Sequence, residues 1–166
     1  FAINLAPPTV CRAQFPLEVS RLLTQYAVEA WQLIVEVTEC STFGSAQQAE
    51  QTLRQLQKMG VRIAIDDFGT GYASYARLKS VDADILKIDG SFIRNIVNNS
   101  LDYQIVASIC HLARMKNMLV VAEYVETEEI RSAVHALGID YVQGYLIGKP
   151  VALESLPEEE ASQADA

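Results

Sequence analysis

Acidic side chains recur along this chain of 166 residues, each close to the end of a short apolar run. Glu36, the tandem Asp66-Asp67 and Glu123 stand at such positions, and Asn4 closes another run. Carboxylate and amide oxygens are the ligands that Mg²⁺ and Mn²⁺ prefer in proteins. Carboxylates that converge would repel one another unless a cation held them. The sequence therefore predicts a divalent-metal site, provided that the fold brings these run ends together.

The tandem aspartates are the most telling feature of this set. Successive strand residues point to opposite faces, but at a strand end the backbone turns, and Asp66 and Asp67 can then face one cavity. Two cations roughly 3.5–4 Å apart are a common device for in-line attack on a phosphodiester. A polar turn before Gly69 is the alternative interpretation.

Lys87 ends an otherwise apolar run, and a lysine buried there needs an anion or water as its partner. Beside metals it could orient an attacking water, whereas a structural salt bridge with Asp89 is the alternative. Zinc is disfavoured, because His111 and His135 have no histidine or cysteine partner at ligand spacing. Both histidines are expected on helices.

The charge balance limits the class of partner. Thirteen basic residues stand against 21 acidic ones, for a net charge of −8. Several unpaired acidic residues gather in the last part of the chain, and no basic stripe is visible, which argues against binding DNA or RNA polymers. An acidic protein can still bind a phosphate ester if a divalent cation lies between carboxylate and phosphate.

The three cysteines are far apart, which is typical of thiols in a reducing compartment. No apolar run is long enough to span a membrane. We therefore expect a cytoplasmic domain, in a protein that a segment before Phe1 could anchor to a membrane.

Strand-like runs alternate with helical patterns along the chain. The expected strands are Phe1–Leu5, Gln32–Val37, Val61–Asp66, Asp84–Ile88, Met118–Glu123 and Tyr141–Ile147. The expected helices are Pro16–Tyr26, Ala46–Met59, Leu101–Lys116 and one from Thr127 to Gly138. Strand followed by helix, repeated in this way, predicts parallel βαβ units of the α/β class.

Two architectures fit that order of elements. A doubly wound sheet should carry a glycine-rich phosphate loop after its first strand, but Ala6-Pro7-Pro8 stands there instead. A (β/α) barrel of the TIM type should carry polar residues at the C-terminal ends of its strands, as this sequence does. We therefore predict about six of the eight units of such a barrel over residues 1–152. Residues 153–166 are expected to be an acidic C-terminal tail.

Six segments together resemble the EAL family of bacterial phosphodiesterases for cyclic di-guanosine monophosphate (cyclic di-GMP). They are Asn4-Leu5, Glu36-Val37-Thr38-Glu39, Asp66-Asp67-Phe68-Gly69-Thr70-Gly71-Tyr72, Leu86-Lys87-Ile88-Asp89, Ala122-Glu123-Tyr124-Val125-Glu126 and Gln143-Gly144-Tyr145. The resemblance runs from Phe1 to about Pro150. It implies hydrolysis of cyclic di-GMP to the linear dinucleotide pGpG at a two-metal site that uses Mg²⁺ or Mn²⁺.

The resemblance also implies roles for individual residues. Asn4, Glu36 and Asp66 match ligands of one metal, Asp67 matches a ligand of the second, and Glu123 and Glu126 match further members of the metal cluster. Lys87 matches the residue that holds the hydrolytic water, so the implied catalytic residues are Lys87, Glu123 and Asp67. Gln143 matches a contact to the dinucleotide, and Glu39 a glutamate that steadies the glycine-rich loop after Asp67.

Three departures from the family pattern are visible. Gly90 stands where the family commonly has arginine, and Tyr124 where it commonly has glycine. The Glu-Ala-Leu motif itself is not in this chain, so we expect residues 1–166 alone to hydrolyse little.

Two alternative functions are also compatible with the sequence. The chain could belong to a catalytically inactive receptor for cyclic di-GMP or to an interaction module. An enolase-like barrel also combines strand-end carboxylates, Mg²⁺ and a lysine, which acts there as a base. The expected partners are cyclic di-GMP, a second copy of the chain, and an upstream sensory or diguanylate-cyclase-like domain.

Overall fold

The computed structural model describes residues 1–38, 46–69, 82–152 and 155. The N-terminal half contains β1 (Ala2–Asn4), α1 (Pro7–Val10), α2 (Phe15–Gln25), the 3₁₀ turn η1 (Ala30–Gln32), β2 (Ile34–Thr38), α3 (Ala46–Lys58) and β3 (Arg62–Phe68). The C-terminal half contains β4 (Ile85–Ile88), α5 (Gly90–Ile93), α6 (Ser100–Met115), β5 (Leu119–Ala122), α7 (Glu128–Ala136) and β6 (Tyr141–Val142).

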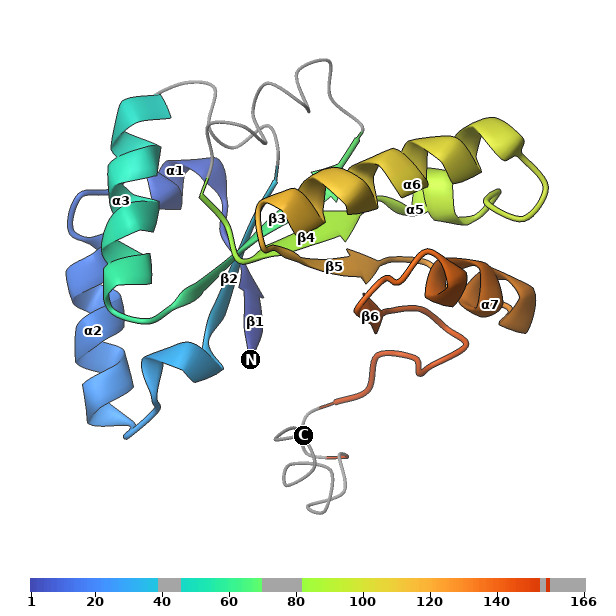
Figure 1. Ribbon diagram of the computed structural model, residues 1–166. Helices are drawn as coiled ribbons and strands as arrows, with labels where there is room; N and C mark the ends of the chain where they lie inside the picture. The colour runs from blue at the N-terminus through green and yellow to red at the C-terminus, as the bar shows by residue number, and fades with distance from the viewer. Residues whose placement is uncertain (39–45, 70–81, 153–154, 156–166) are drawn as a thin grey trace.

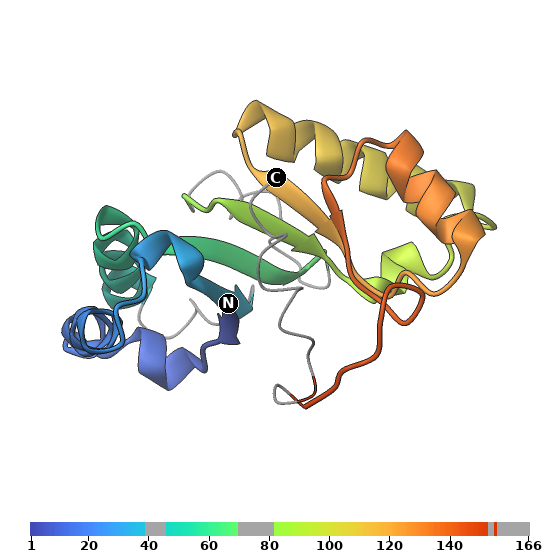
Figure 2. The same ribbon diagram turned by 90° about the horizontal axis from the view of Figure 1, so that it is seen from below.

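The six strands form one parallel sheet in the order β1-β2-β3-β4-β5-β6. Each strand therefore lies beside its neighbour in sequence, as in a (β/α) barrel, whereas a doubly wound sheet reverses its order at a switch point. Helices α2 and α3 lie beside the first strands, and α6 and α7 beside the last (Figures 1 and 2). The predicted α/β barrel class is confirmed as a six-stranded part of such a barrel.

The two faces of the sheet differ in chemistry because strand side chains alternate. Val35 and Val37 of β2, and Leu86 and Ile88 of β4, point into the apolar core. The residues between them point to the opposite face. Glu36 and Lys87 are therefore on the same face of the sheet, in the layer that is the interior of a barrel.

The predicted helices are present with ends close to those expected. Thr127 Oγ1 caps α7 by accepting a hydrogen bond from Ile130 N at 3.3 Å, and Glu128 and Glu129 fill the first turn. His111 and His135 are on helices, as predicted, and both are exposed. None of the described helices is long and apolar enough to cross a membrane.

The last predicted strand, Tyr141–Ile147, is wrong after Val142. A Cβ on Gly144 would lie 2.3 Å from the carbonyl oxygen of Val125, so the two backbones are in close contact there. The chain then turns, and Ile147 N and Gly148 N both donate to Gly144 O. The acidic tail predicted for residues 153–166 lies almost wholly outside the described residues and stays a prediction.

Candidate active site

Lys87 of β4 lies at the centre of the inner face of the sheet. Its Nζ donates to Glu36 Oε2 at 2.9 Å, to Asp66 Oδ1 at 2.8 Å and to Glu123 Oε1 at 2.9 Å. The Lys87 side chain is only 7% exposed. All three ammonium hydrogens thus have a carboxylate acceptor, one each from β2, β3 and the residue after β5. The alternative of a salt bridge to Asp89 is not seen, since Asp89 Oδ1 instead caps α5 by accepting from Ser91 N at 2.9 Å.

These partners decide the charge of the lysine. Burial lowers the pKa of Lys87, but the hydrogen bonds to Asp66, Glu123 and Glu36 outweigh it and raise the pKa above the ordinary value. Lys87 is therefore an ammonium at neutral pH. It can donate hydrogen bonds and balance negative charge, but it cannot serve as a proton-abstracting base.

A β-bulge brings the tandem aspartates to one site. The register between β3 and β4 shifts after Ile65, so Asp66 and Asp67 together stand opposite the single residue Lys87. Asp67 has a left-handed backbone with φ 54°, and this conformation breaks the strand alternation. The interpretation of the tandem as two carboxylates that face one cavity is thereby supported over a simple polar turn.

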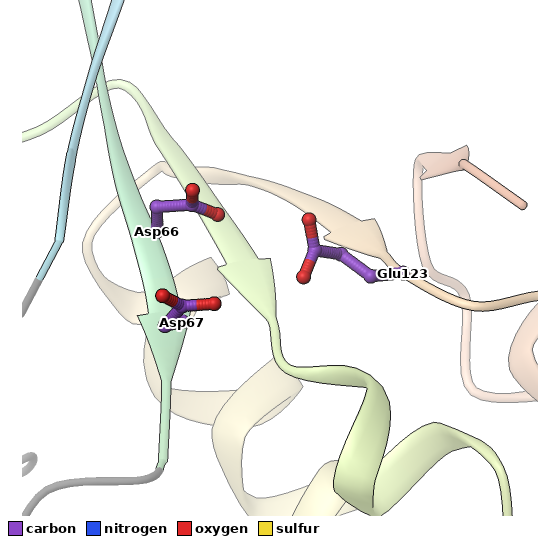
Figure 3. Close-up of side chains that lie close together, drawn as sticks. All are labelled: Asp66, Asp67 and Glu123. Carbon is purple, nitrogen blue, oxygen red and sulfur yellow. The ribbon is translucent and has the colours of Figure 1, made fainter. Parts of the chain in front are cut away.

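Asp66, Asp67 and Glu123 form a carboxylate cluster, and their side chains point toward one another (Figure 3). One oxygen of each lies within 4.8 Å of the others. Burial, the charge of Asp66 and the charge of Asp89 raise the pKa of Asp67. Burial also raises the pKa of Glu123, and it does so more than the bond to Lys87 lowers it.

This cluster fits a divalent cation. Its three carboxylates and that of Glu36 offer only oxygen donors, and they outnumber the one ammonium, that of Lys87, that the described residues place among them. Hard divalent ions take such donors. Within the part of the chain that the structure describes, no other group of acidic, histidine or cysteine side chains gathers in this way.

A pocket of about 370 Å³ opens beside the cluster. Asp67 and Glu123 contribute to its wall, and so do Glu126 and Gln143, two of the residues predicted for this site. Gln143 directly follows β6 and is held there by its backbone, because its N donates to Ala122 O at 2.8 Å. The pocket is therefore continuous with the carboxylate cluster.

Three predicted residues stand apart from the cluster. Asn4 is the last residue of β1, pairs in register with Glu36 and is exposed. Glu36 is bound to Lys87 and does not belong to the closest group of carboxylates. Glu39 and the loop from Thr70 to Tyr72 lie outside the described residues.

Sequence reasoning assigned no role to Tyr124 and Tyr145, although both line the pocket. Tyr124 directly follows Glu123, a predicted metal ligand, and Tyr145 comes two residues after Gln143, a predicted contact to the dinucleotide. Their position just past a strand end was the signal that could have identified them.

Comparison with known proteins identifies the relatives of this chain. It is 74% identical over 153 residues to the cyclic di-GMP phosphodiesterase PdeF of Escherichia coli (strain K12), a match that spans 92% of this chain and 20% of PdeF. It is 41% identical to MucR of Pseudomonas aeruginosa, a bifunctional diguanylate cyclase/cyclic di-GMP phosphodiesterase, over 93% of this chain and 23% of MucR. The chain thus spans about a fifth of the length of these relatives.

Solved structures share the fold. The PaMucR phosphodiesterase in complex with c-di-GMP matches with a TM-score of 0.86 and 40% identity, over 94% of this chain and 63% of that one. BlrP1 of Klebsiella pneumoniae, in a complex with manganese and cyclic di-GMP, matches with a TM-score of 0.83 and 32% identity, over 87% of this chain and 37% of that one. The acidic cluster of the present chain fits the same use of a divalent metal.

The model of the EAL domain family matches residues 1–150, which is most of the chain. Together with these relatives, that match shows that the chain belongs to the EAL domain family.

Proposed function

We propose that this chain supplies most of the catalytic centre of a phosphodiesterase that hydrolyses cyclic di-GMP to linear pGpG. The observation that carries the proposal is the buried ammonium of Lys87, held by three carboxylates beside a pocket that is large enough for part of a nucleotide. The names of PdeF, MucR and the PaMucR complex support the same substrate.

Mg²⁺ or Mn²⁺ is the proposed metal, in a two-metal site. Asp66, Asp67 and Glu123 are the residues we assign to it from the geometry, and Asn4, Glu36 and Glu126 are further ligands that the family resemblance implies. A divalent ion, when bound, supplies Lewis-acid polarisation of the phosphate and a more acidic bound water.

The chain's own residues then have distinct tasks. In the reaction, an oxygen of water forms a bond to phosphorus, the bond from phosphorus to one 3′ oxygen breaks, and that oxygen takes up a proton. Lys87, as a fixed cation, balances the charge that builds up on the phosphoryl oxygens. To orient the attacking water, as the family resemblance implies, Lys87 must exchange one of its three hydrogen bonds to carboxylates for one to the water. Asp67 and Glu123 border both the cluster and the pocket, so they link the proposed metal site to the space that a bound phosphodiester would enter.

An enolase-like reaction is disfavoured. It would need a lysine that is neutral before it abstracts a proton, whereas the partners of Lys87 keep it charged. An inactive receptor remains the alternative, and it differs from the proposal only in the chemical step.

The wider context of the chain is also proposed. We infer a cytoplasmic domain that acts as a homodimer and receives its signal from an upstream sensory or diguanylate-cyclase-like domain. The name of MucR, which combines a diguanylate cyclase with a phosphodiesterase, supports the last point. Light scattering of the full-length protein tests the dimer.

The decisive experiment incubates the full-length protein with cyclic di-GMP and separates the products by liquid chromatography. Mg²⁺ or Mn²⁺ should give pGpG, whereas Ca²⁺ should not, because its longer and looser coordination misplaces the attacking water. Binding of cyclic di-GMP with no pGpG in Mg²⁺ or Mn²⁺ would favour the receptor. Undiminished hydrolysis in excess chelator would contradict the metal site.

A further inference from the structure

Tyr124 is an exposed aromatic residue in the pocket wall. It lines the pocket beside Glu123 and Gln143, and the residue is 44% exposed. Its backbone is left-handed, with φ 55°. Glycine adopts that region freely, whereas a residue with a Cβ is strained in it. Strain held at a site points to a function for the strained residue.

Gly90 provides the space that the Tyr124 ring occupies. A Cβ built on Gly90 would lie 2.1 Å from Cδ2 of Tyr124 and 2.5 Å from its Cγ. No side chain larger than hydrogen fits while the ring is in this place. The two positions at which the sequence departs from its family pattern are therefore one structural unit.

Arg94 fixes the ring from the same short helix. Its backbone N donates to Gly90 O at 2.9 Å, which places it one turn after that glycine. Its guanidinium carbon lies 3.9 Å from the centroid of the Tyr124 ring, which is a close cation–π contact. Arg94 thus covers one face of the ring, while Tyr124 as a whole remains 44% exposed in the pocket wall.

We propose that Tyr124 is a substrate-binding residue whose exposed ring stacks on a guanine base of the dinucleotide, with Gly90 and Arg94 as positioning residues. This inference rests on the proposed function, because it concerns the same pocket and the same ligand. Every base offers a π face, and loss of one stacking ring lowers affinity roughly 5- to 150-fold. Tyr124 makes this contact in the bound ground state and in the transition state alike, so it acts on KM more than on kcat.

The test is a double-mutant cycle in the full-length protein with Mn²⁺. Tyr124→Gly should raise KM for cyclic di-GMP by about 5-fold or more while kcat changes less than about threefold. Gly90→Ala should raise KM in the same direction, although it removes no contact, because it displaces the ring. The increases in KM caused by the two single changes should not multiply in the double variant, because both act through the same ring. If Gly90→Ala lowers the thermal unfolding midpoint, the double variant should regain it, because the Tyr124 ring that clashes with the new methyl group is absent.

Two controls separate stacking from general damage. Tyr124→Phe keeps the ring and should restore KM to within about threefold of the wild type. Tyr26→Ala removes a tyrosine that is 68% exposed at the end of α2, away from the pocket, and should leave KM unchanged.

The outcomes distinguish this inference from the proposed function. If the wild type neither binds nor hydrolyses cyclic di-GMP, the proposed function fails and this inference fails with it. If the wild type binds cyclic di-GMP without hydrolysing it, the same double-mutant cycle is measured by calorimetry, with the change in Kd in place of the change in KM. An active wild type with unchanged KM in Tyr124→Gly, or with a loss in kcat alone, overturns the stacking role and leaves the proposed function intact.

Discussion

A left-handed backbone conformation occurs at the ends of two strands and at the ends of two helices, and its consequences differ between the two places. Among the described residues, four that are not glycine have a left-handed backbone, namely Ala27, Asp67, Asn117 and Tyr124. Ala27 and Asn117 follow helices α2 and α6. Asp67 is the next-to-last residue of β3, Tyr124 comes two residues after β5, and both line the pocket.

At the helix ends, backbone hydrogen bonds account for the conformation. Val28 N donates to Leu23 O at 2.9 Å, and Met118 N donates to Ala113 O at 2.9 Å. This pattern satisfies carbonyls that a helix leaves open at its C-terminus. The left-handed residue there ends the helix and does not line the pocket.

At the strand ends, the conformation changes which side chains meet. Alternation would send Asp66 and Asp67 to opposite faces, and likewise Glu123 and Tyr124. The left-handed residue lets both members of each pair contribute to one site. The comparison teaches that a functional strand end is one where two successive residues share a cavity.

Removal of Lys87 should have the largest effect, because it breaks the charge balance of the strand-end region. Lys87→Ala leaves the partly buried carboxylates of Glu36, Asp66 and Glu123, whose side chains are 12–13% exposed, without their cation, which should cost about 3–5 kcal/mol in the metal-free protein. Hydrolysis should also be lost while binding of cyclic di-GMP stays measurable. Denaturant unfolding and the chromatographic assay check both effects.

An exposed ion pair provides the control for Lys87. Arg54 bonds Glu50 one turn away on α3, with side chains 65% and 48% exposed. Arg54→Ala should change the free energy of unfolding by no more than about 1 kcal/mol. Equal losses in the free energy of unfolding for Lys87→Ala and Arg54→Ala would show that the ion pairs of Lys87 have no special role in stability.

Asp67→Asn should have the next largest effect. Asparagine tolerates a left-handed backbone, so the bulge should persist while one carboxylate charge is lost. We expect kcat to fall about 100-fold or more and the affinity for Mn²⁺ to weaken. Asp82→Asn, at an exposed position before β4, is the matched control and should behave as the wild type. Near-normal turnover in Asp67→Asn would remove Asp67 from the catalytic set.

The raised pKa values of Asp67 and Glu123 predict a pH dependence. Burial, the first cause of both shifts, makes these carboxyls keep their protons to a higher pH than ordinary ones. Protons should therefore compete with Mn²⁺ over a pH range that lies above the usual one for aspartate and glutamate. Calorimetric titration of Mn²⁺ at a series of pH values measures this. An affinity that falls only within the ordinary carboxyl range would contradict the shifts.

The effect of these groups on stability has a defined sign. In the metal-free protein, a carboxyl whose pKa is raised by folding favours the folded state as the pH falls through that raised value. Lys87 acts in the same sense but at a higher pH, because its stabilising contribution is complete below the ordinary lysine pKa and is lost as the pH rises through the raised value.

Ala27→Gly should have the smallest effect and should separate the two kinds of left-handed residue. Relief of the strain at φ 51° should stabilise the protein by about 1 kcal/mol without any change in activity. The corresponding change at Tyr124 is expected to raise KM. A change in KM for Ala27→Gly would remove the distinction between helix ends and strand ends.

Much of the fold was predictable because it depends on local pattern. Five of the six strands lie within two residues of their predicted ends, and the sixth begins at the predicted residue but is shorter, since β-branched runs and helix caps are readable along the chain. The convergence of Glu36, Asp66 and Glu123 followed from the rule that parallel strands end on one side. The class of the site was therefore accessible before the structure.

The details that required the structure depend on contacts between distant segments. The bulge that places Asp67 is a register shift between β3 and β4, and no single strand encodes it. The acceptors of Lys87 come from three other parts of the chain, whereas the sequence pointed to Asp89 as the alternative. The close fit of Tyr124 on Gly90 is likewise invisible in either motif alone.

The most direct test of the central claim is to locate the metal. Crystals of the full-length protein, grown with Mn²⁺ and cyclic di-GMP, should give anomalous scattering from manganese between Asp66, Asp67 and Glu123. Carboxylate oxygens should lie about 2.2 Å from the ion, and the dinucleotide should occupy the pocket beside Gln143. Active protein whose manganese binds elsewhere, with these carboxylates held only by Lys87, would contradict the account.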